Sequence, residues 1–182
     1  MQQPLYKLIG DIMNRVEKIF NAILVVIIAG VLLGAFGVQV FKHEQPCPLC
    51  LLQRLAMIGL AIGALMNCKF GPSKAHYALS LISCIFGSFV SMRQFFLHVC
   101  PDFPTFGHPF WGLSLYTWAF LVFATSVAYI SVLLLVFNKS RLDEERQHLN
   151  WFCQVAFAML FLVAAGNVGW ALYACQLGPC QG

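Results

Sequence analysis

The sequence predicts an all-α integral membrane protein that forms one membrane domain. Apolar residues make up 60% of the 182 positions and charged residues only 10%, and the mean hydropathy is +0.77. The apolar residues gather into five runs, each close to the roughly 20 residues that an α-helix needs to cross a hydrocarbon core. The net charge of +4 comes from scattered basic residues rather than a basic patch, so we expect no nucleic-acid partner.

The first predicted span covers residues 19–41 and follows a mixed, polar segment at residues 1–18. We expect that segment to form a short helix on the membrane surface. Basic residues before an apolar run are also typical of a cleaved signal peptide. Because this run is longer than a signal-peptide core and no clear A-x-A cleavage site follows it, the sequence favours a span that is kept in the protein.

Four more spans follow, separated by segments that a regular helix does not accommodate. A turn around Gly71-Pro72 divides the second span from the third. Residues 98–111 contain three prolines and one glycine, which exclude a regular helix there. Residues 138–150 are the most charged stretch and form the last connection. The four spans are predicted at residues 49–66, 76–97, 112–137 and 151–174.

Small residues lie four positions apart in four of the five spans, on one face of each predicted helix. Such pairs let helix backbones approach closely in lipid, where packing drives helix association. We therefore expect a compact bundle. The pairs are Gly30/Gly34, Gly59/Gly63, Gly87/Ser91 and Ala165/Gly169.

The basic residues set the predicted orientation in the membrane. With the N-terminus on the cytoplasmic side, eight Lys and Arg residues lie in cytoplasmic segments, whereas only Lys42 lies in an outer one. Arg54 and Arg93 lie within spans. We therefore expect a cytoplasmic N-terminus and, after five spans, a C-terminus on the outer side.

This orientation places two close cysteine pairs on the same outer face. Cys47 and Cys50 lie at the start of the second span, and Cys175 and Cys180 follow the fifth. Two dithiol/disulfide couples on one oxidising face can exchange electrons through mixed disulfides. Cys100 also lies on the outer side. The remaining cysteines are expected to be packing residues: Cys68, Cys84 and Cys153.

The first pair belongs to a Cys47-Pro48-Leu49-Cys50 motif at the start of the second span. Proline suits the first turn of a helix, where its missing N–H costs nothing. Cys50 then lies near unpaired N–H groups and the positive end of the helix dipole, which favours its thiolate. Arg54, four residues later on the same face, can lower the pKa of the Cys50 thiol and donate hydrogen bonds to a lipid-soluble acceptor. The alternative is that Arg54 extends to the membrane interface.

Two residues near the outer end of the third span are further candidates for binding the same acceptor. Arg93 lies at a depth comparable to that of Arg54, and it either completes the same polar pocket or anchors its helix. His98 lies at the outer boundary, where an imidazole can carry protons near neutral pH. The alternative for His98 is an ordinary interface histidine.

The Cys47-Pro48-Leu49-Cys50 motif followed by Gln53-Arg54 resembles the DsbB family of disulfide-generating membrane quinone reductases, over about residues 20–130. The resemblance implies a DsbB-like four-helix bundle in the bacterial inner membrane, to which this chain adds a fifth transmembrane helix. It also implies that ubiquinone or menaquinone from the membrane pool binds beside Cys50, with a hydrogen bond from Arg54. The implied electron donor is a periplasmic thioredoxin-fold dithiol oxidase, a DsbA-like protein.

The chain departs from the family in its second cysteine pair, which the family usually carries in the loop between the third and fourth spans. Here that loop contains only Cys100, and the chain instead has Cys175 and Cys180 after its fifth span. We expect this tail pair to replace the loop pair. A disulfide between Cys100 and a tail cysteine is the alternative.

The hypothesis that follows is a membrane thiol:quinone oxidoreductase. Electrons pass from a periplasmic protein dithiol through Cys175/Cys180 to Cys47/Cys50, and from there to the quinone. The alternative is a membrane protein in which these four cysteines form a structural zinc site. The loose spacing of the tail pair and the oxidising face disfavour thiolate ligands, so we expect no metal.

Overall fold

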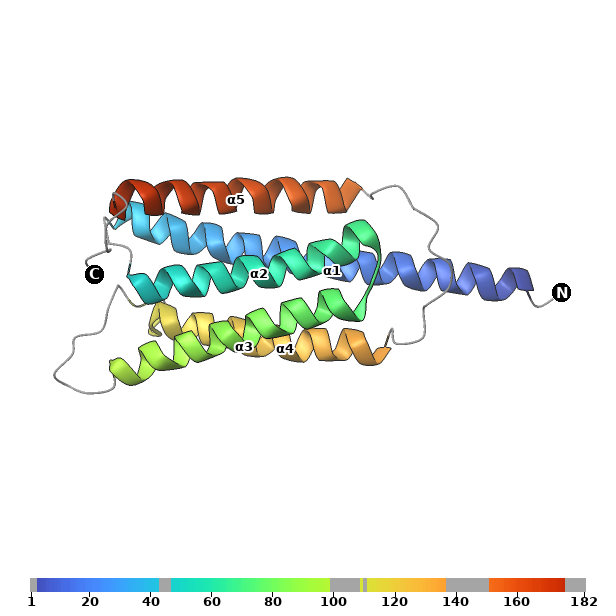
Figure 1. The fold of residues 1–182 in the computed structure, drawn as a ribbon, viewed down its shortest axis with the longest axis horizontal. Coiled ribbons are helices and arrows are strands. Elements are labelled where there is room, and N and C mark those ends of the chain that lie inside the picture. Colours follow the sequence, from blue (N-terminus) through green and yellow to red (C-terminus); the bar gives the residue numbers. More distant parts are fainter. Residues whose placement is uncertain (1–2, 43–46, 99–108, 110, 137–150, 176–182) are drawn as a thin grey trace.

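The structure of the protein, a computed structural model, describes residues 3–42, 47–98, 109, 111–136 and 151–175. The regular elements within these residues are five α-helices that form one bundle (Figure 1). They are α1 (Gln3–Phe41), α2 (Pro48–Phe70), α3 (Lys74–Leu97), α4 (Leu115–Val136) and α5 (Trp151–Cys175). Each contains a segment whose length and apolar character suit a membrane span. The predicted all-α membrane bundle with a fifth transmembrane helix is confirmed.

α1 is longer than the first predicted span because it includes the preceding polar segment. The helix runs unbroken for 39 residues, and its N-terminal part extends beyond the other helices (Figure 1). Residues 11–29 contain neither proline nor glycine, so nothing interrupts the helix where the polar segment meets the apolar run. The expectation of a separate surface helix is therefore wrong.

α2 lies at the centre of the bundle, with α1, α3 and α5 packed against it. α4 packs mainly on α3, so α4 and α5 lie on opposite sides of the molecule (Figure 1). The C-terminal ends of α1, α3 and α5 and the N-terminal end of α2 lie at the same end of the bundle. We call this end the Cys47 end, after the residue that precedes α2.

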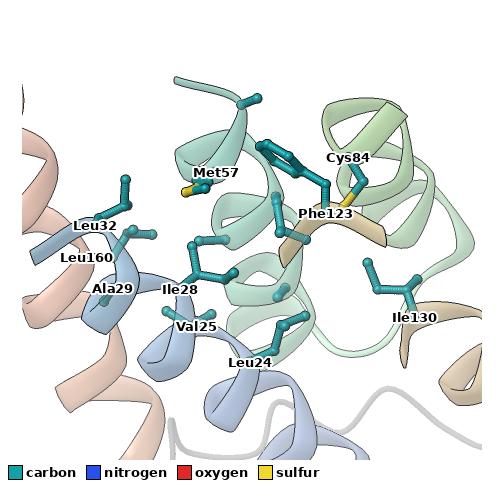
Figure 2. Packing of buried hydrophobic residues seen from close by; sticks show 14 of the residues in the cluster. Leu24, Val25, Ile28, Ala29, Leu32, Met57, Cys84, Phe123, Ile130 and Leu160 are labelled. Carbon is teal, nitrogen blue, oxygen red and sulfur yellow. The ribbon is translucent and has the colours of Figure 1, made fainter. Parts of the chain in front are cut away.

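The interior of the bundle is apolar (Figure 2). Ile28 and Leu32 of α1 are at most 1% exposed, and Phe123 and Ile130 of α4 are completely buried. Cys84 of α3 is also completely buried within this cluster. The prediction that Cys84 is a packing residue is therefore confirmed.

The outward faces of the helices are apolar as well. Ile82, Ile85 and Phe89 of α3 are between 65% and 69% exposed. In water such a continuous apolar surface is unfavourable, whereas in a bilayer it contacts lipid tails. The surface of the bundle therefore agrees with the transmembrane assignment of its helices.

Small residues bring α2, α3 and α4 into close contact. A Cβ atom on Gly63 would collide with Ser80 and with the backbone oxygen of His76, and one on Gly87 would collide with the Phe123 ring. The predicted close packing is thus confirmed for α2 and α3. It is wrong for α1 and α5, whose small residues are exposed: Gly30, Gly34, Ala165 and Gly169.

A buried polar network links α1, α2 and α3 at the end of the bundle opposite Cys47. Tyr77 donates a hydrogen bond of 2.8 Å to the Glu17 carboxylate, and Asn21 donates one of 2.8 Å to the Tyr77 hydroxyl. Asn67 in turn donates to the side-chain oxygen of Asn21 at 3.1 Å. These bonds satisfy polar groups in an apolar interior and fix the three helices relative to one another. We call these four side chains the Asn67 network.

Candidate redox site at the start of α2

Cys47 is the N-cap residue of α2. Its backbone is extended, with φ −71° and ψ 137°, and its Sγ accepts a hydrogen bond from the Cys50 N–H at 3.4 Å. Pro48 lies in the first turn, as the sequence predicted. The sulfur thus takes the place that a serine or aspartate oxygen has in other N-caps. This local geometry holds both cysteines of the motif at the Cys47 end.

The first turn of α2 favours the thiolate of Cys47. A hydrogen bond from the Cys50 side chain lowers the pKa of Cys47 to about 6, against the opposing effect of burial. The backbone N–H groups of Cys50 and Leu49 and the charge of His98 act in the same direction as that bond. The sequence predicted that the helix N-terminus stabilises a thiolate at Cys50 instead. The structure differs because the first-turn N–H of Cys50 points back at the capping sulfur.

Gln94 of α3 contacts both sulfurs. Its Nε2 donates to Cys47 Sγ at 3.7 Å and to Cys50 Sγ at 3.6 Å. Its Oε1 accepts a hydrogen bond of 2.9 Å from Gln53 of α2, which fixes the amide with its NH₂ group toward the cysteines. Gln94 is only 1% exposed. The two glutamines therefore form a buried polar link between α2 and α3, directly beside the cysteine pair.

Sequence reasoning missed Gln94 and gave Gln53 no role of its own, although a signal was present. A glutamine inside an apolar span must find a hydrogen-bond partner, and two such residues at similar depth can satisfy each other. The sequence instead singled out Arg93, whose side chain is exposed and, among the described residues, has no hydrogen bond to the cysteines. One step along a helix turns the side chain by about 100°. The assignment of Arg93 to the acceptor site stays a prediction.

His98 lies beside the cysteine pair at the C-terminal end of α3. Its Nδ1 lies 2.8 Å from the backbone oxygen of Gln94, and its ring stacks on Tyr116 of α4 with 5.4 Å between centroids. Donation from Nδ1–H to that oxygen leaves Nε2 as the nitrogen that can exchange a proton. The structure thus brings His98 to the cysteines, whereas its chemical role stays a prediction.

Arg54 lies one turn below Cys50 and points toward α1 and α5. Its guanidinium donates to the backbone oxygen of Ala35 at 3.2 Å and to Oδ1 of Asn167 at 3.1 Å. The side chain is therefore held inside the bundle and does not extend to the interface. Both partners are neutral oxygens, and a guanidinium carries more N–H groups than these two bonds use. Its positive charge is thus available to a ligand oxygen.

The structure covers only part of the second cysteine pair. Cys175 is the last residue of α5, and this helix ends at the Cys47 end of the bundle (Figure 1). The Cys175 side chain, Cys180 and Cys100 lie outside the described residues, so the pairing of these cysteines stays a prediction. Within the part of the chain that the structure describes, no three His, Cys, Asp or Glu side chains are grouped as metal ligands.

Known relatives of the chain carry the name Disulfide bond formation protein B. The relative from Acidovorax sp. (strain JS42) is 33% identical over 109 residues, which are 56% of this chain and 62% of the relative. The relative from Pseudomonas syringae pv. tomato is 34% identical over 90 residues, which are 47% of this chain and 53% of the relative. The matched part thus spans between half and two thirds of each of these relatives. No solved structure matches the chain.

A family model described as "Disulfide bond formation protein DsbB" matches residues 17–107, which is half of the chain. The matched region contains most of α1, all of α2 and α3, and the cysteine motif with its arginine and glutamines. The five apolar helices agree with the multi-pass architecture that this match requires. The protein is therefore an inner-membrane protein of bacterial type, and it belongs to the DsbB family of disulfide bond formation proteins.

Proposed function

We propose that the protein is a membrane thiol:quinone oxidoreductase that generates disulfides in periplasmic proteins. The arrangement at the start of α2 carries the proposal. There, a cysteine pair with hydrogen-bond donors on its sulfurs lies one helical turn from a guanidinium held inside the bundle. Family membership supports the proposal, since the relatives are named for disulfide bond formation.

The proposed electron path begins at the tail of the chain. A thiolate of a reduced, DsbA-like thioredoxin-fold oxidase attacks the Cys175–Cys180 disulfide, and the donor's second thiol resolves the mixed disulfide. The donor leaves with a disulfide, and Cys175 and Cys180 hold the electron pair and the protons as a dithiol. This dithiol then reduces the Cys47–Cys50 disulfide by the same two-step exchange.

Cys47 is the proposed point of entry into the second disulfide. It caps α2 at the end of the bundle where α5 also ends, whereas Cys50 lies within the first turn. A tail thiolate that attacks Cys47 releases Cys50, and the second tail thiol then expels Cys47 from the mixed disulfide. The lowered pKa of Cys47, about 6, makes it a good leaving group in this last step.

A bound ubiquinone or menaquinone would supply the electron-pair acceptor that reoxidises Cys47 and Cys50. The residues near Arg54 fit such a ligand. Arg54 would donate to a carbonyl oxygen, and the Gln39 amide of α1 is buried with both polar atoms unpartnered among the described residues. An unpaired buried amide is costly, and a ligand with oxygen acceptors relieves that cost. His98, through its Nε2, is the proposed proton carrier.

Dithiol-dependent quinone reduction by the purified protein tests this function. The Cys47→Ala and Cys50→Ala variants should lose turnover completely, because each removes one half of the disulfide that must be reduced. Cys84→Ala is the matched control, since Cys84 is a buried packing cysteine of α3 and should leave turnover intact. Undiminished turnover in either of the first two variants contradicts the proposal.

A further inference from the structure

α5 contributes directly to the environment of Arg54. Asn167 of this helix is 6% exposed, and its Oδ1 accepts a hydrogen bond from the Arg54 guanidinium at 3.1 Å. The Asn167 Nδ2 donates to the backbone oxygen of Val163 at 2.8 Å. This second bond fixes the amide so that Oδ1, the acceptor, faces the guanidinium. Arg54 is thus held between a backbone oxygen of α1 and a side chain of α5 whose own orientation is fixed.

The choice of asparagine has an electrostatic consequence. A carboxylate at this position would form an ion pair and neutralise the guanidinium inside the bundle. The amide oxygen positions the guanidinium and leaves its net charge in place. A guanidinium that is held in position without being neutralised is the arrangement that a neutral, oxygen-bearing ligand requires.

Unpaired polar groups lie next to this arrangement on both α1 and α5. The backbone oxygen of Ala35 is also the α-helical partner of the Gln39 N–H, so Gln39 lies within one turn of the Arg54 contact. Trp170 follows Asn167 by one turn, and its ring meets Phe36 of α1 edge-on at 5.9 Å between centroids. The Trp170 Nε1 and both polar atoms of the Gln39 amide are buried without a partner among the described residues.

These groups match the two redox forms of a quinone. The carbonyl oxygens of the oxidised form accept hydrogen bonds, which the Trp170 indole N–H, the Gln39 NH₂ and Arg54 can donate. The hydroxyl groups of the reduced form also donate, and the Gln39 Oε1 can accept. The apolar faces of the helices around them suit the ring.

We propose that α5 forms one wall of the quinone pocket, with Asn167 as the positioning residue of Arg54 and with Trp170 and Gln39 as direct contacts of the quinone head group. The proposal rests on the function proposed above and assigns it a feature outside the family match. That match ends at residue 107, before α5 begins. The fifth helix would therefore do more than place Cys175 at the Cys47 end of the bundle.

Two substitutions of similar size at Asn167 separate positioning from packing. Asn167→Leu fills the space but cannot accept the hydrogen bond from Arg54. Because that bond involves a charged group, its loss should raise the quinone KM and Kd about tenfold or more. Asn167→Asp keeps an acceptor oxygen but forms an ion pair that neutralises the guanidinium, so it should also raise KM and Kd for the quinone. kcat at saturating quinone should change little in either variant. A packing role predicts native KM and Kd in both variants, because leucine and aspartate each fill the space of the asparagine side chain.

The measurements use the full chain in detergent or lipid discs with a short-chain ubiquinone. KM and kcat come from dithiol-dependent turnover, and Kd comes from filtration binding of the radiolabelled quinone without any donor present. Asn67→Leu is the control, because it also removes a buried asparagine but lies about 20 Å from Arg54 along α2. It should lower stability and leave KM and Kd unchanged.

Trp170→Phe keeps the aromatic contact with Phe36 and removes only the N–H, so it should fold and weaken quinone binding severalfold. Native KM and Kd in both Asn167→Leu and Trp170→Phe, in a protein whose wild type reduces quinone, overturn this inference alone. A wild type that neither binds nor reduces quinone overturns the proposed function, and the inference with it.

Discussion

At the level of single residues, the capping geometry of α2 favours the thiolate of Cys47, the cysteine that precedes the helix. A helix N-terminus offers free N–H groups, and the motif alone suggests that they stabilise the cysteine inside the first turn. In the structure the cysteine before the turn caps the helix and accepts the N–H of Cys50. The sequence shows that the motif opens a helix, but the capping residue depends on backbone angles that side-chain types do not specify.

The charge on Cys47 predicts a pH profile for the reduced protein. The pKa of Cys47 is lowered from 9.0 to about 6, so alkylation of Cys47 by iodoacetamide should reach half of its maximal rate near pH 6. The Cys50→Ala variant should shift that midpoint upward, because the Cys50 hydrogen bond is the largest cause of the lowering. Because folding lowers the pKa of Cys47, its thiolate adds to the free energy of unfolding. This contribution is complete above pH 9.0, the ordinary thiol pKa, and is lost as the pH falls through about 6. Peptide mass spectrometry of the Cys47 peptide measures the rates, and an unchanged midpoint in the variant contradicts the assignment.

Arg93 and Gln94 show why the rest of the site was harder to predict. Both are polar residues near the end of the third span, and charge makes the arginine the more conspicuous candidate. The register of α3 turns Gln94 to the cysteines and Arg93 to the outside. Apolar residues cover both the inner and the lipid-facing sides of a membrane helix, so hydropathy alone does not reveal its inward face.

At the scale of helices, small residues mark close packing only where their face meets another helix. Gly63 and Gly87 lie against α3 and α4 side chains or backbone, whereas Gly30 and Gly34 of α1 have open space around them. The small residues are four positions apart in all of these helices. This spacing shows that they share one face of the helix, but not whether another helix or lipid contacts that face. This ambiguity explains why the packing prediction is right for α2 and α3 and wrong for α1 and α5.

The contrast between these glycines predicts opposite effects of alanine. Gly63→Ala places a methyl group against Ser80 and the backbone oxygen of His76, which should cost about 1–3 kcal/mol of stability through overpacking. Gly30→Ala adds a methyl group in open space and should stabilise the helix by about 0.5–1 kcal/mol. Thermal unfolding of both variants in the same detergent measures the difference. Equal midpoints contradict the close α2–α3 contact.

For the molecule as a whole, α5 packs against α1 and α2, which belong to the region that matches the family model. Hydropathy was sufficient to predict five membrane helices, since each apolar run has the length of a span. It did not predict that α5 docks on α1 and α2, on the side away from α4. The outward faces of all the helices are apolar in the same way, so the docking partner depends on contacts such as Arg54 with Asn167. The orientation, with the N-terminus cytoplasmic and the C-terminus periplasmic, remains a prediction from the basic residues.

The tail relay predicts the disulfides of the resting protein. Non-reducing peptide mapping should find Cys175 linked to Cys180 and Cys47 linked to Cys50. Cys175→Ser and Cys180→Ser should abolish the reaction with protein dithiols and leave quinone Kd unchanged, because the tail is the entrance and not the acceptor site. A disulfide between Cys100 and a tail cysteine would contradict this path. The donor dithiol would then react with that disulfide instead of Cys175–Cys180.

The proposed passage of electrons from a protein dithiol to a quinone can be tested by the stoichiometry of turnover without oxygen. Purified protein is mixed with a reduced thioredoxin-fold oxidase and a limiting amount of quinone, and quinol and donor disulfide are counted together. We expect one quinol for each donor disulfide formed in turnover, since both couples exchange an electron pair. We also expect that the Cys50→Ala variant forms no quinol and oxidises at most one equivalent of donor per protein, which is the capacity of its Cys175–Cys180 disulfide. Donor oxidation that continues without quinol formation beyond the capacity of the protein's own disulfides, or quinol formation that persists in Cys50→Ala, would contradict the proposed electron path.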